Sequence, residues 1–366
     1  MNATRLSFTT LGKSMKKNLI ALAVAGALIS PLSAQAVEVA GELLNIYGKV
    51  HVSVDNSDTD GLYETDPTQS DGISISSNSS RLGFKGKYEQ VVYQLEQEVR
   101  FDDSSAGNFA NRNSFIGLGG NWGQFVVGVH DTPFKTVGSK WGIFGDSVGE
   151  RRAILGAGHS SGNQLNERVK NMMMYQFKNK AIKVQAMYAV EPEKGSGAVD
   201  NNEASMLGAG LWWNISGFTL SAGYEDWTGH SHIGDGNAYR LAAKWKIASH
   251  QIGAIYENID PDVIGEFSRA AYGVNYKWKF SKKWDLRAQY LVADSADDTT
   301  DTGASKIGLG VYHKLNKMTK LYVAYGATAN DDNAKFQAVD GGHGDEVKTV
   351  VGGNPSSLSL GMEFKF

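Results

Sequence analysis

The sequence predicts an all-β fold, a transmembrane antiparallel β-barrel of 16 strands, and the segment 356–366 shows the pattern most clearly. Apolar side chains occupy every second position there, and polar or small ones fill the gaps; the apolar set is Leu358, Leu360, Met362, Phe364 and Phe366. A strand sends successive side chains to opposite faces, so this segment has one apolar and one polar face. In a membrane barrel the first meets lipid and the second a watery lumen.

The chain of 366 residues begins with a predicted signal peptide, residues 1–36. Lys16 and Lys17 precede an apolar run, residues 19–29, and Ala34-Gln35-Ala36 supplies small residues for cleavage. The apolar run is too short to span a bilayer as a helix. Residues 37–366 are the predicted barrel domain, and Met1 and Met15 both remain possible starts.

Composition narrows the class of protein. The leader carries four basic residues and no acidic one, so its removal takes the formal charge from −3 to −7, which disfavours nucleic acid as a partner. The chain has no Cys, which excludes disulfides and thiolate metal sites, and its eight His residues show no ligand spacing. Residues 37–366 hold no run of eighteen apolar residues. No cofactor is expected.

The strand pattern begins at Leu44, where even positions are apolar or small and odd positions are polar or aromatic up to Asp55. There are sixteen such segments in all, mostly nine to eleven residues long, as a tilted membrane strand requires. They begin near residues 44, 75, 90, 111, 124, 168, 181, 204, 217, 237, 250, 270, 283, 304, 319 and 357. A soluble β-sandwich is the alternative, and it does not explain an apolar face on every strand.

The connections alternate between short turns and long polar loops, for example 178–180 against 55–72 and 329–355. This is the up-and-down pattern of outer-membrane barrels, so we expect short periplasmic turns and long extracellular loops. Aromatic residues gather at the strand ends beside the short turns and predict an interfacial girdle: Trp213, Phe218, Trp245, Trp278, Phe280 and Trp284.

One connection, residues 131–167, is far longer than its neighbours. It contains Phe134, Trp141, Ile143, Phe144 and Ile154. Exposing that much apolar surface to solvent is unfavourable, so we expect this third loop to fold back into the barrel lumen and pack there.

These segments resemble the general diffusion porins of Gram-negative outer membranes over essentially the whole chain after the leader. The resemblance rests on Ile46-Tyr47-Gly48-Lys49, on Ser80-Arg81-Leu82-Gly83-Phe84-Lys85-Gly86, on Asn111-Arg112 with Phe115-Ile116-Gly117-Leu118, on Gly123, Gly128 and Thr132-Pro133, and on the terminal Phe. It implies a passive channel, not an enzyme, for small hydrophilic solutes and ions. It also implies a homotrimer in the outer membrane, in contact with lipid and lipopolysaccharide. Phe366 and Phe364 look like the assembly signal read by the barrel-assembly machinery.

In this family the third loop narrows the pore, and its acidic residues face a ladder of basic residues on the opposite wall. Lys49, Arg81 and Arg112 fall on the ladder positions, and Arg168 matches them more loosely. Independently, alternation turns Lys49 and Arg81 into the lumen, and Arg100 extends the same wall.

On the loop, the acidic candidates for the constriction are Asp146 and Glu150. Arg151 and Arg152 follow at once, which departs from the purely acidic loop of many members. They can pair with Glu150 or turn the pore toward anions, so the ion preference stays open.

Two other functions remain as alternatives. The segment Gly158-His159-Ser160-Ser161-Gly162 matches a nucleophile elbow, as in a phospholipase-like barrel enzyme, although that motif needs a strand-to-helix turn and here lies in a Gly-rich loop. A substrate-selective porin for phosphate or sugars is the second. Acidic groups at Asp55, Asp58 and Asp60 and at 294–301 are solvated loop tips or calcium sites, without EF-hand spacing.

Overall fold

A computed structural model describes residues 37–38, 41–69, 71–102, 109–194 and 203–366. Residues 36–366 form one unit. The predicted signal peptide lies outside the described residues, so its cleavage after Ala36 stays a prediction. No helix in the described part of the chain is long and apolar enough to cross a membrane.

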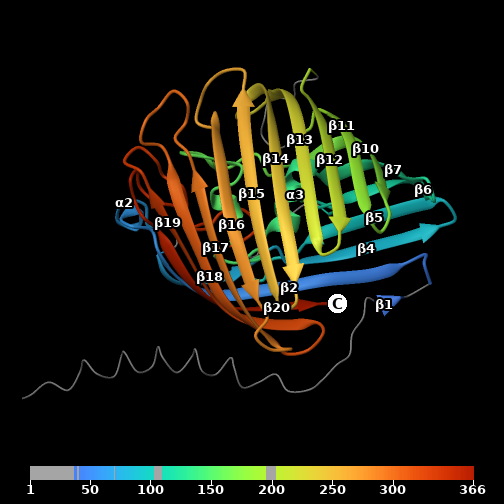
Figure 1. Cartoon of the computed structure of the whole chain (residues 1–366), viewed down its shortest axis with the longest axis horizontal. Helices are drawn as coiled ribbons and strands as arrows, with labels where there is room; N and C mark the ends of the chain where they lie inside the picture. The colour runs from blue at the N-terminus through green and yellow to red at the C-terminus, as the bar shows by residue number, and fades with distance from the viewer. Residues whose placement is uncertain (1–36, 39–40, 70, 103–108, 195–202) are drawn as a thin grey trace, which may run out of the picture. The chain divides into compact units, whose positions relative to one another are not determined.

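The unit is a closed antiparallel barrel whose wall strands follow one another around the barrel in chain order (Figure 1). Its sheet has 18 strands, which include the short β1 (Val37–Glu38) and count β3 and β4 separately, so the barrel has 16 strand positions. The first half comprises β2 (Asn45–Asp58), β3 (Gly72–Ser77), β4 (Arg81–Tyr88), β5 (Val91–Glu98), β6 (Ser114–Gly120), β7 (Gly123–Asp131), β10 (Arg168–Lys178) and β11 (Ile182–Val190). The second comprises β12 (Ser205–Ile215), β13 (Phe218–His230), β14 (Gly234–Ile247), β15 (His250–Pro261), β16 (Arg269–Trp278), β17 (Trp284–Ala293), β18 (Ala304–Lys314), β19 (Thr319–Asn330) and β20 (Ser356–Lys365).

The barrel closes where β20 pairs with β2, with His51 opposite Glu363 and Val52 opposite Met362. Beyond the end of β20, Phe366 exchanges two backbone hydrogen bonds with Gly48, at 2.9 and 3.1 Å. Closure pairs the last strand of the wall with the first, as a bilayer requires because lipid offers backbone groups no partner.

The prediction of 16 antiparallel strands is confirmed, and the predicted starts lie within about three residues of the observed ones. The second strand differs, because it is interrupted at residues 78–80 and both halves, β3 and β4, pair with β2. The Ser80 hydroxyl accepts from the His51 amide at 2.9 Å and donates to the His51 carbonyl at 3.1 Å. A side chain therefore takes over ladder bonds at the break, next to Ser79, whose φ is 49°.

Burial follows the predicted alternation. In β14, Ala238, Arg240 and Ala242 point inward and are buried, whereas Tyr239 and Leu241 are exposed on the outside. The same outward apolar face recurs around the barrel and matches a lipid-facing surface.

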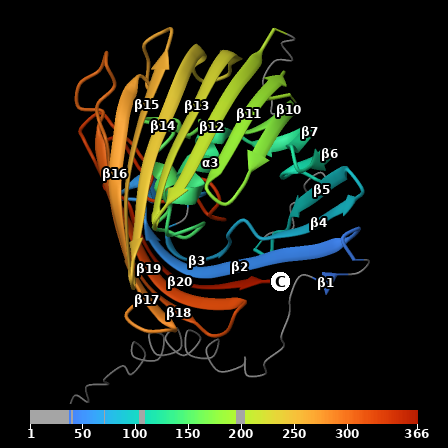
Figure 2. The same cartoon turned by 45° about the vertical axis from the view of Figure 1, so that its right-hand side comes forward.

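Residues 132–167 lie against the inner wall. Their helix α3 (Pro133–Trp141) starts at Thr132, whose hydroxyl accepts from the Lys135 amide at 3.1 Å, and Pro133 stands at its first turn. Phe134, Val137 and Trp141 are buried against β12–β15, and α3 lies inside the strand wall in Figure 2. A 3-10 turn, η1 (Arg151–Ala153), and the hairpin β8 (Ala157–Gly158) and β9 (Gly162–Asn163) complete the loop.

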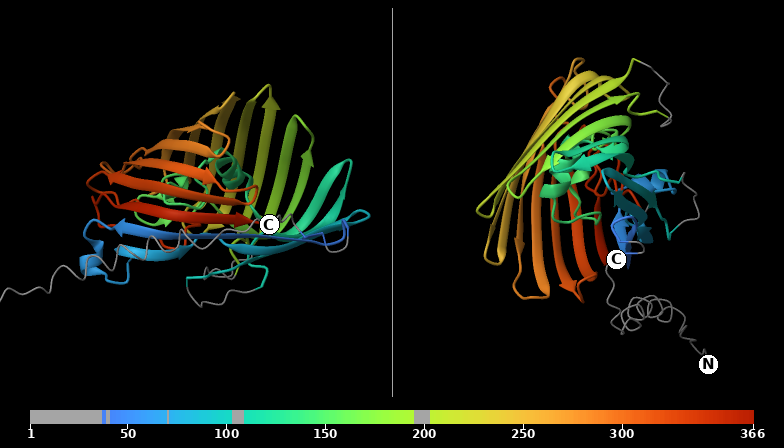
Figure 3. Two further views of the ribbon diagram at one scale, coloured as in Figure 1. Left: turned by 90° about the horizontal axis from the view of Figure 1, so that it is seen from below. Right: turned by 90° about the vertical axis from the view of Figure 1, so that its right-hand side faces the viewer.

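The connection between β19 and β20, residues 331–355, has an apolar core that its polar composition did not indicate. Phe336, Ala338, Val339 and Val347 are fully buried, and Val339 and Val347 form an isolated bridge. This segment contacts the junction between β3 and β4, where the Ser79 hydroxyl donates to the Gly342 carbonyl at 2.9 Å. The connection between β2 and β3 instead carries a short helix, α2 (Leu62–Thr65), without buried residues. Figure 3 shows the barrel from two further sides.

Candidate functional site

A polar cavity of about 1000 Å³ runs through the lumen beside the long loop. All of the residues predicted for the constriction except Lys49 line it, and cationic side chains outnumber acidic ones on its walls. We call the end of the barrel with the long connections the loop end, and the opposite end the turn end.

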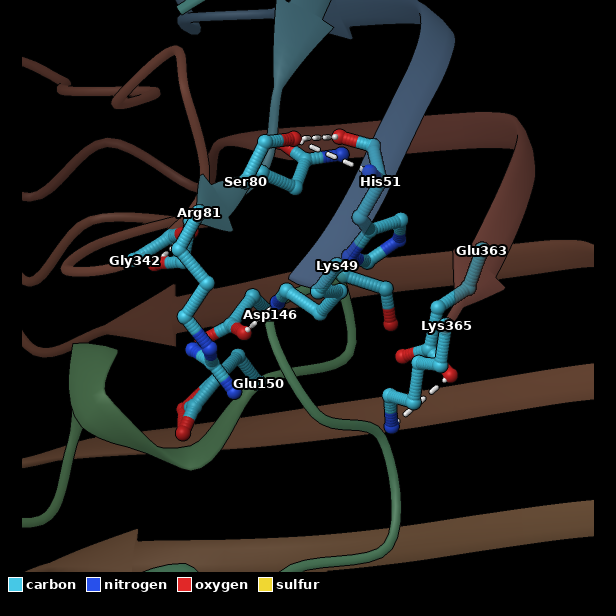
Figure 4. A network of polar contacts seen from close by, with 12 residues as sticks. Lys49, His51, Ser80, Arg81, Asp146, Glu150, Gly342, Glu363 and Lys365 are labelled. Atoms are coloured by element: carbon cyan, nitrogen blue, oxygen red, sulfur yellow. Dashed lines mark hydrogen bonds and ion pairs between the residues drawn. The ribbon is translucent and has the colours of Figure 1, made fainter. Parts of the chain in front are cut away.

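Asp146 joins the loop to the barrel wall. One of its carboxylate oxygens lies 2.5 Å from Lys49 Nζ of β2, and the other accepts from Arg152 of the loop at 2.7 Å (Figure 4). Burial raises the pKa of Asp146, but the charges of Lys49 and Arg152 outweigh it and hold this pKa well below its ordinary value. The carboxylate is therefore ionised at neutral pH.

Glu150 organises the two arginines that follow it. Its carboxylate caps η1 by accepting from the Arg152 amide at 2.9 Å, and it forms ion pairs with the guanidinium groups of both Arg151 and Arg152. Glu150 and Arg151 are buried. Of the two roles expected for the arginines, pairing with Glu150 is the one observed.

The basic wall contains its own carboxylates. Glu96 of β5 lies 2.9 Å from Arg112 Nε and 3.5 Å from Arg81 Nε, and Glu98 lies 3.2 Å from Arg112. Glu96 also accepts from the Tyr47 hydroxyl at 3.0 Å. Arg81 and Arg112 are thus partly compensated before any loop charge acts on them. These two acids were not among the residues predicted from the sequence, although inward alternation on β5 points to them.

Arg168 and Arg100 occupy the edges of the same wall. Arg168 forms an ion pair with Asp131 at 3.2 Å, and Lys135 of α3 reaches the same carboxylate at 3.0 Å. Arg100 lies 3.8 Å from Glu98 and its side chain is half exposed. The structure therefore brings Lys49 to the loop acid Asp146, whereas Arg81, Arg112 and Arg168 pair with carboxylates of the strands.

A second set of inward cations on the barrel wall binds the loop, and these residues were not predicted from the sequence. Arg240 pairs with Glu257 at 2.5 Å and donates to the Phe134 carbonyl at 3.1 Å. Further cations of this set donate to loop carbonyls: Arg269 to Ile154, Arg287 to Ile143 and Lys306 to Val148. The only feature of the sequence that marks these residues is a long cationic side chain at an inward position. Solvated side chains of the lumen share this feature, so it does not identify the contacts with the loop.

The serine motif forms a hairpin turn. Ser160 lies between β8 and β9, and its hydroxyl donates to Glu266 at 2.5 Å. This geometry differs from the strand-to-helix elbow that a nucleophilic serine of that motif needs. In the parts of the chain that the structure describes, no three His, Cys, Asp or Glu side chains gather as a metal site.

The carboxyl-terminal aromatics lie at the barrel seam. The rings of Phe364 and Phe366 are 5.7 Å apart, and a Cβ atom added at Gly48 would overlap the Phe366 ring. Their assigned role as an assembly signal stays a prediction.

Comparison with known proteins agrees with this architecture. The sequence profile described as Gram-negative porin matches residues 21–333. The chain is 24% identical to a monosaccharide porin of Halomonas sp over 311 residues, covering 78% of this chain and 81% of that protein. It is 25% identical over 277 residues to outer membrane protein U of Vibrio vulnificus, covering 70% of this chain and 73% of that protein.

Among solved structures, the anion-selective porin from Comamonas acidovorans aligns with a TM-score of 0.72 at 20% identity, over 88% of this chain and 99% of that one. At that identity the likeness shows the fold alone. The profile, however, spans most of the chain and coincides with a closed barrel of 16 strand positions. The chain belongs to the Gram-negative porin family.

Proposed function

We propose that this protein is a passive outer-membrane channel for small hydrophilic solutes and ions, with its constriction between residues 146–152 of the loop and the basic wall that includes Lys49 of β2 and Arg81 of β4. The observation that carries the proposal is the Lys49–Asp146–Arg152 arrangement, which ties a folded-in loop to the lumenal wall beside a polar cavity.

Charges that face each other across a narrow, water-filled aperture create a transverse field. Such a field orients water and polar solutes and raises the energy of apolar ones. On the loop side the candidates are Asp146 and Glu150 with Arg151 and Arg152. On the wall they are Lys49, Arg81, Arg112, Arg168 and Arg100.

A substrate-selective porin is the second candidate, supported by the similarity to a monosaccharide porin. The described lining of the cavity is dominated by charged groups, and Phe144 is its one aromatic residue apart from histidines. Charged walls with little aromatic surface favour a general channel for polar solutes over a sugar-binding track.

The assembly is proposed to be a homotrimer in contact with outer-membrane lipid and lipopolysaccharide, inserted by the barrel-assembly machinery. The support is family membership together with likeness to the trimer form of OmpT from Vibrio cholerae, which has a TM-score of 0.61 at 19% identity over 88% of this chain and 99% of that one. Chemical cross-linking of intact outer membranes tests this assembly, and a product that contains monomers but no trimers contradicts it.

Single-channel recording in planar bilayers tests the channel. The Lys49→Ala/Asp146→Ala double variant removes the tie between loop and wall without changing net charge, so we expect a larger and noisier conductance than in wild type. Lys320→Ala/Glu363→Ala is the matched control, because it removes a 2.6 Å ion pair that the loop does not share.

Folded wild-type barrels that conduct no ions contradict the channel function. Equal conductance of wild type and the Lys49/Asp146 variant contradicts the position of the constriction and leaves the channel function standing.

A further inference from the structure

Five lysines gather on the lumenal surface toward the turn end, beyond the constriction. Lys140 closes the last turn of α3, Lys178 and Lys183 face each other across β10 and β11, and Lys244 and Lys246 occupy successive inward positions of β14. We call them the lysine cluster. None of them belongs to the proposed constriction.

The cluster is held in place by contacts that leave its charge uncompensated. Lys244 Nζ donates to the Lys140 carbonyl at 2.7 Å, so the strand cation caps the carboxyl end of α3. Lys183 Nζ lies 4.5 Å from the centre of the Trp212 ring, a cation–π contact. These contacts fix position, but a carbonyl and a ring do not neutralise an ammonium group.

The charged groups that act on Lys183 and Lys244 are other members of the cluster. Lys183 is repelled by Lys140 and Lys178, and Lys244 by Lys246 and Lys140. Within the described residues, no ion pair joins any of the five to a carboxylate. This contrasts with Arg112 or Lys49, each of which lies within 3 Å of an acid.

A buried donor without an acceptor adjoins the cluster. Trp212 is 5% exposed, and its indole N–H has no hydrogen-bond partner among the described atoms. Lys140 and Lys183 also line the lumenal cavity, so the cluster is open to a permeating solute. Ammonium groups and an N–H donor, with no acid among them, form a site that only an anion complements.

We propose that Lys140, Lys183 and Lys244, with Lys178 and Lys246 at the rim, form a subsite for small polyvalent anions such as tricarboxylates or inorganic phosphate on the turn-end side of the constriction. This inference rests on the proposed channel function and deepens it, because it gives the pore a preference for anions. The site binds an anion by charge, holds it beside the aperture, and raises its local concentration.

The test uses the full-length barrel in planar bilayers at low salt, since screening at 0.15 M acts over about 8 Å. Reversal potentials in a KCl gradient give the chloride-to-potassium permeability ratio, and millimolar citrate added to one side probes the subsite. Wild type is expected to prefer chloride and to be blocked by citrate more strongly from the turn end.

The Lys140→Gln/Lys183→Gln/Lys244→Gln variant is expected to lose about threefold or more of the chloride preference, the change expected from one unit charge at about 7 Å in a water-like dielectric. Its sidedness of citrate block should disappear. The matched control, Lys282→Gln/Lys283→Gln/Lys317→Gln, removes the same charge from exposed turns and should behave as wild type. Arginine at the three cluster positions should restore both properties.

A conducting wild type that prefers potassium, or a glutamine variant with unchanged reversal potential and citrate block, overturns the subsite alone. Folded wild type without conductance overturns the channel function and the subsite with it. If inorganic phosphate blocks as citrate does, the site recognises charge; if only citrate blocks, it recognises carboxylates.

Discussion

Asp146 places one carboxylate between a wall cation, Lys49, and a loop cation, Arg152. Buried carboxylates are costly unless they are paired, and pairing on both sides explains how this one remains ionised. On the adjoining stretch of wall, Glu96 of β5 pairs with Arg112 and Arg81 in the same manner. Selectivity at this scale depends on which charges remain after such pairs form.

Arg81 and Arg112 give the first prediction. Replacing both with Ser leaves Glu96 and Glu98 without these partners, so this stretch of the wall becomes acidic. A unit charge about 5 Å from an ion contributes roughly 3 kcal/mol at an effective dielectric near 20, so ion preference should shift several-fold toward cations. Reversal potentials in a salt gradient measure it.

The control adds Glu96→Gln to the Arg81/Arg112 variant, which should return the reversal potential toward that of wild type. If the double variant and wild type reverse at one voltage, these arginines do not border the aperture.

At the scale of elements, two connections share the lumen. The loop of residues 132–167 and the connection of residues 331–355 meet where Asp340 accepts from the Asn163 amide at 2.6 Å. Burial raises the pKa of Asp340 to about 7, with help from Glu346, although the hydrogen bond from Asn163 and the charge of Arg152 act against it.

This raised pKa gives the second prediction. Because the packed carboxyl binds its proton more tightly than an unpacked one, packing of residues 331–355 is strongest at low pH and weakens as pH rises from about 4 to about 7. Between pH 6 and pH 8 the opening equilibrium should increase about tenfold. Hydrogen exchange of residues 336–343, corrected for intrinsic rates, measures it.

Asp340→Asn should remove this pH dependence, whereas Asp332→Asn, at an exposed acid of the same connection, should keep it. Protection that is equal at pH 6 and pH 8 in wild type would disprove the role of Asp340.

At the scale of the whole molecule, the barrel crosses the outer membrane as one closed sheet, and its stability depends on the seam between β20 and β2. Phe366 and Gly48 lock that seam through two backbone bonds and close ring packing. A glycine is required at position 48 because any side chain there meets the Phe366 ring.

The third prediction concerns this seam. Phe366→Ser and Gly48→Val should each sharply reduce the yield of folded, heat-modifiable barrel in the outer membrane. In the Phe366→Ser background, Gly48→Val should reduce the yield of folded barrel little further, since the Phe366 ring that the valine would displace is absent. Gly265→Val is the control, because the nearest atom to an added Cβ there is 3.9 Å away. Wild-type yields of both single variants would refute the lock.

Orientation gives the fourth prediction. Long connections face the cell exterior and short turns the periplasm in barrels of this kind. A cysteine placed at Asp332 should therefore react with an impermeant label on intact cells, and one at Lys180 should not. The chain has no native Cys, so the background is clean. Labelling only at position 180 would show that the barrel has the opposite orientation in the membrane.

The number of strands and their approximate starts could be predicted from the sequence alone. Alternation is a local property, because each residue's face follows from its neighbours, so strand starts and the inward direction of Lys49 and Arg81 were predictable. The apolar residues of 131–167 indicated that this loop packs against protein. The break at residues 78–80 was not predictable, since a hydroxyl replaces ladder bonds there without changing the alternation.

The charge pairs and the path of the long connections could not be predicted from the sequence and are seen only in the tertiary structure. Lys49 and Asp146 are 97 positions apart, and their contact depends on how a loop without periodic structure crosses the lumen. The buried apolar core of residues 331–355 and the lysine cluster likewise join elements that are distant in the chain. The alternation of apolar and polar residues determines which face of a strand a side chain takes. Its charged partner depends instead on strand register, barrel closure and the path of the loops, and no short stretch of sequence encodes these.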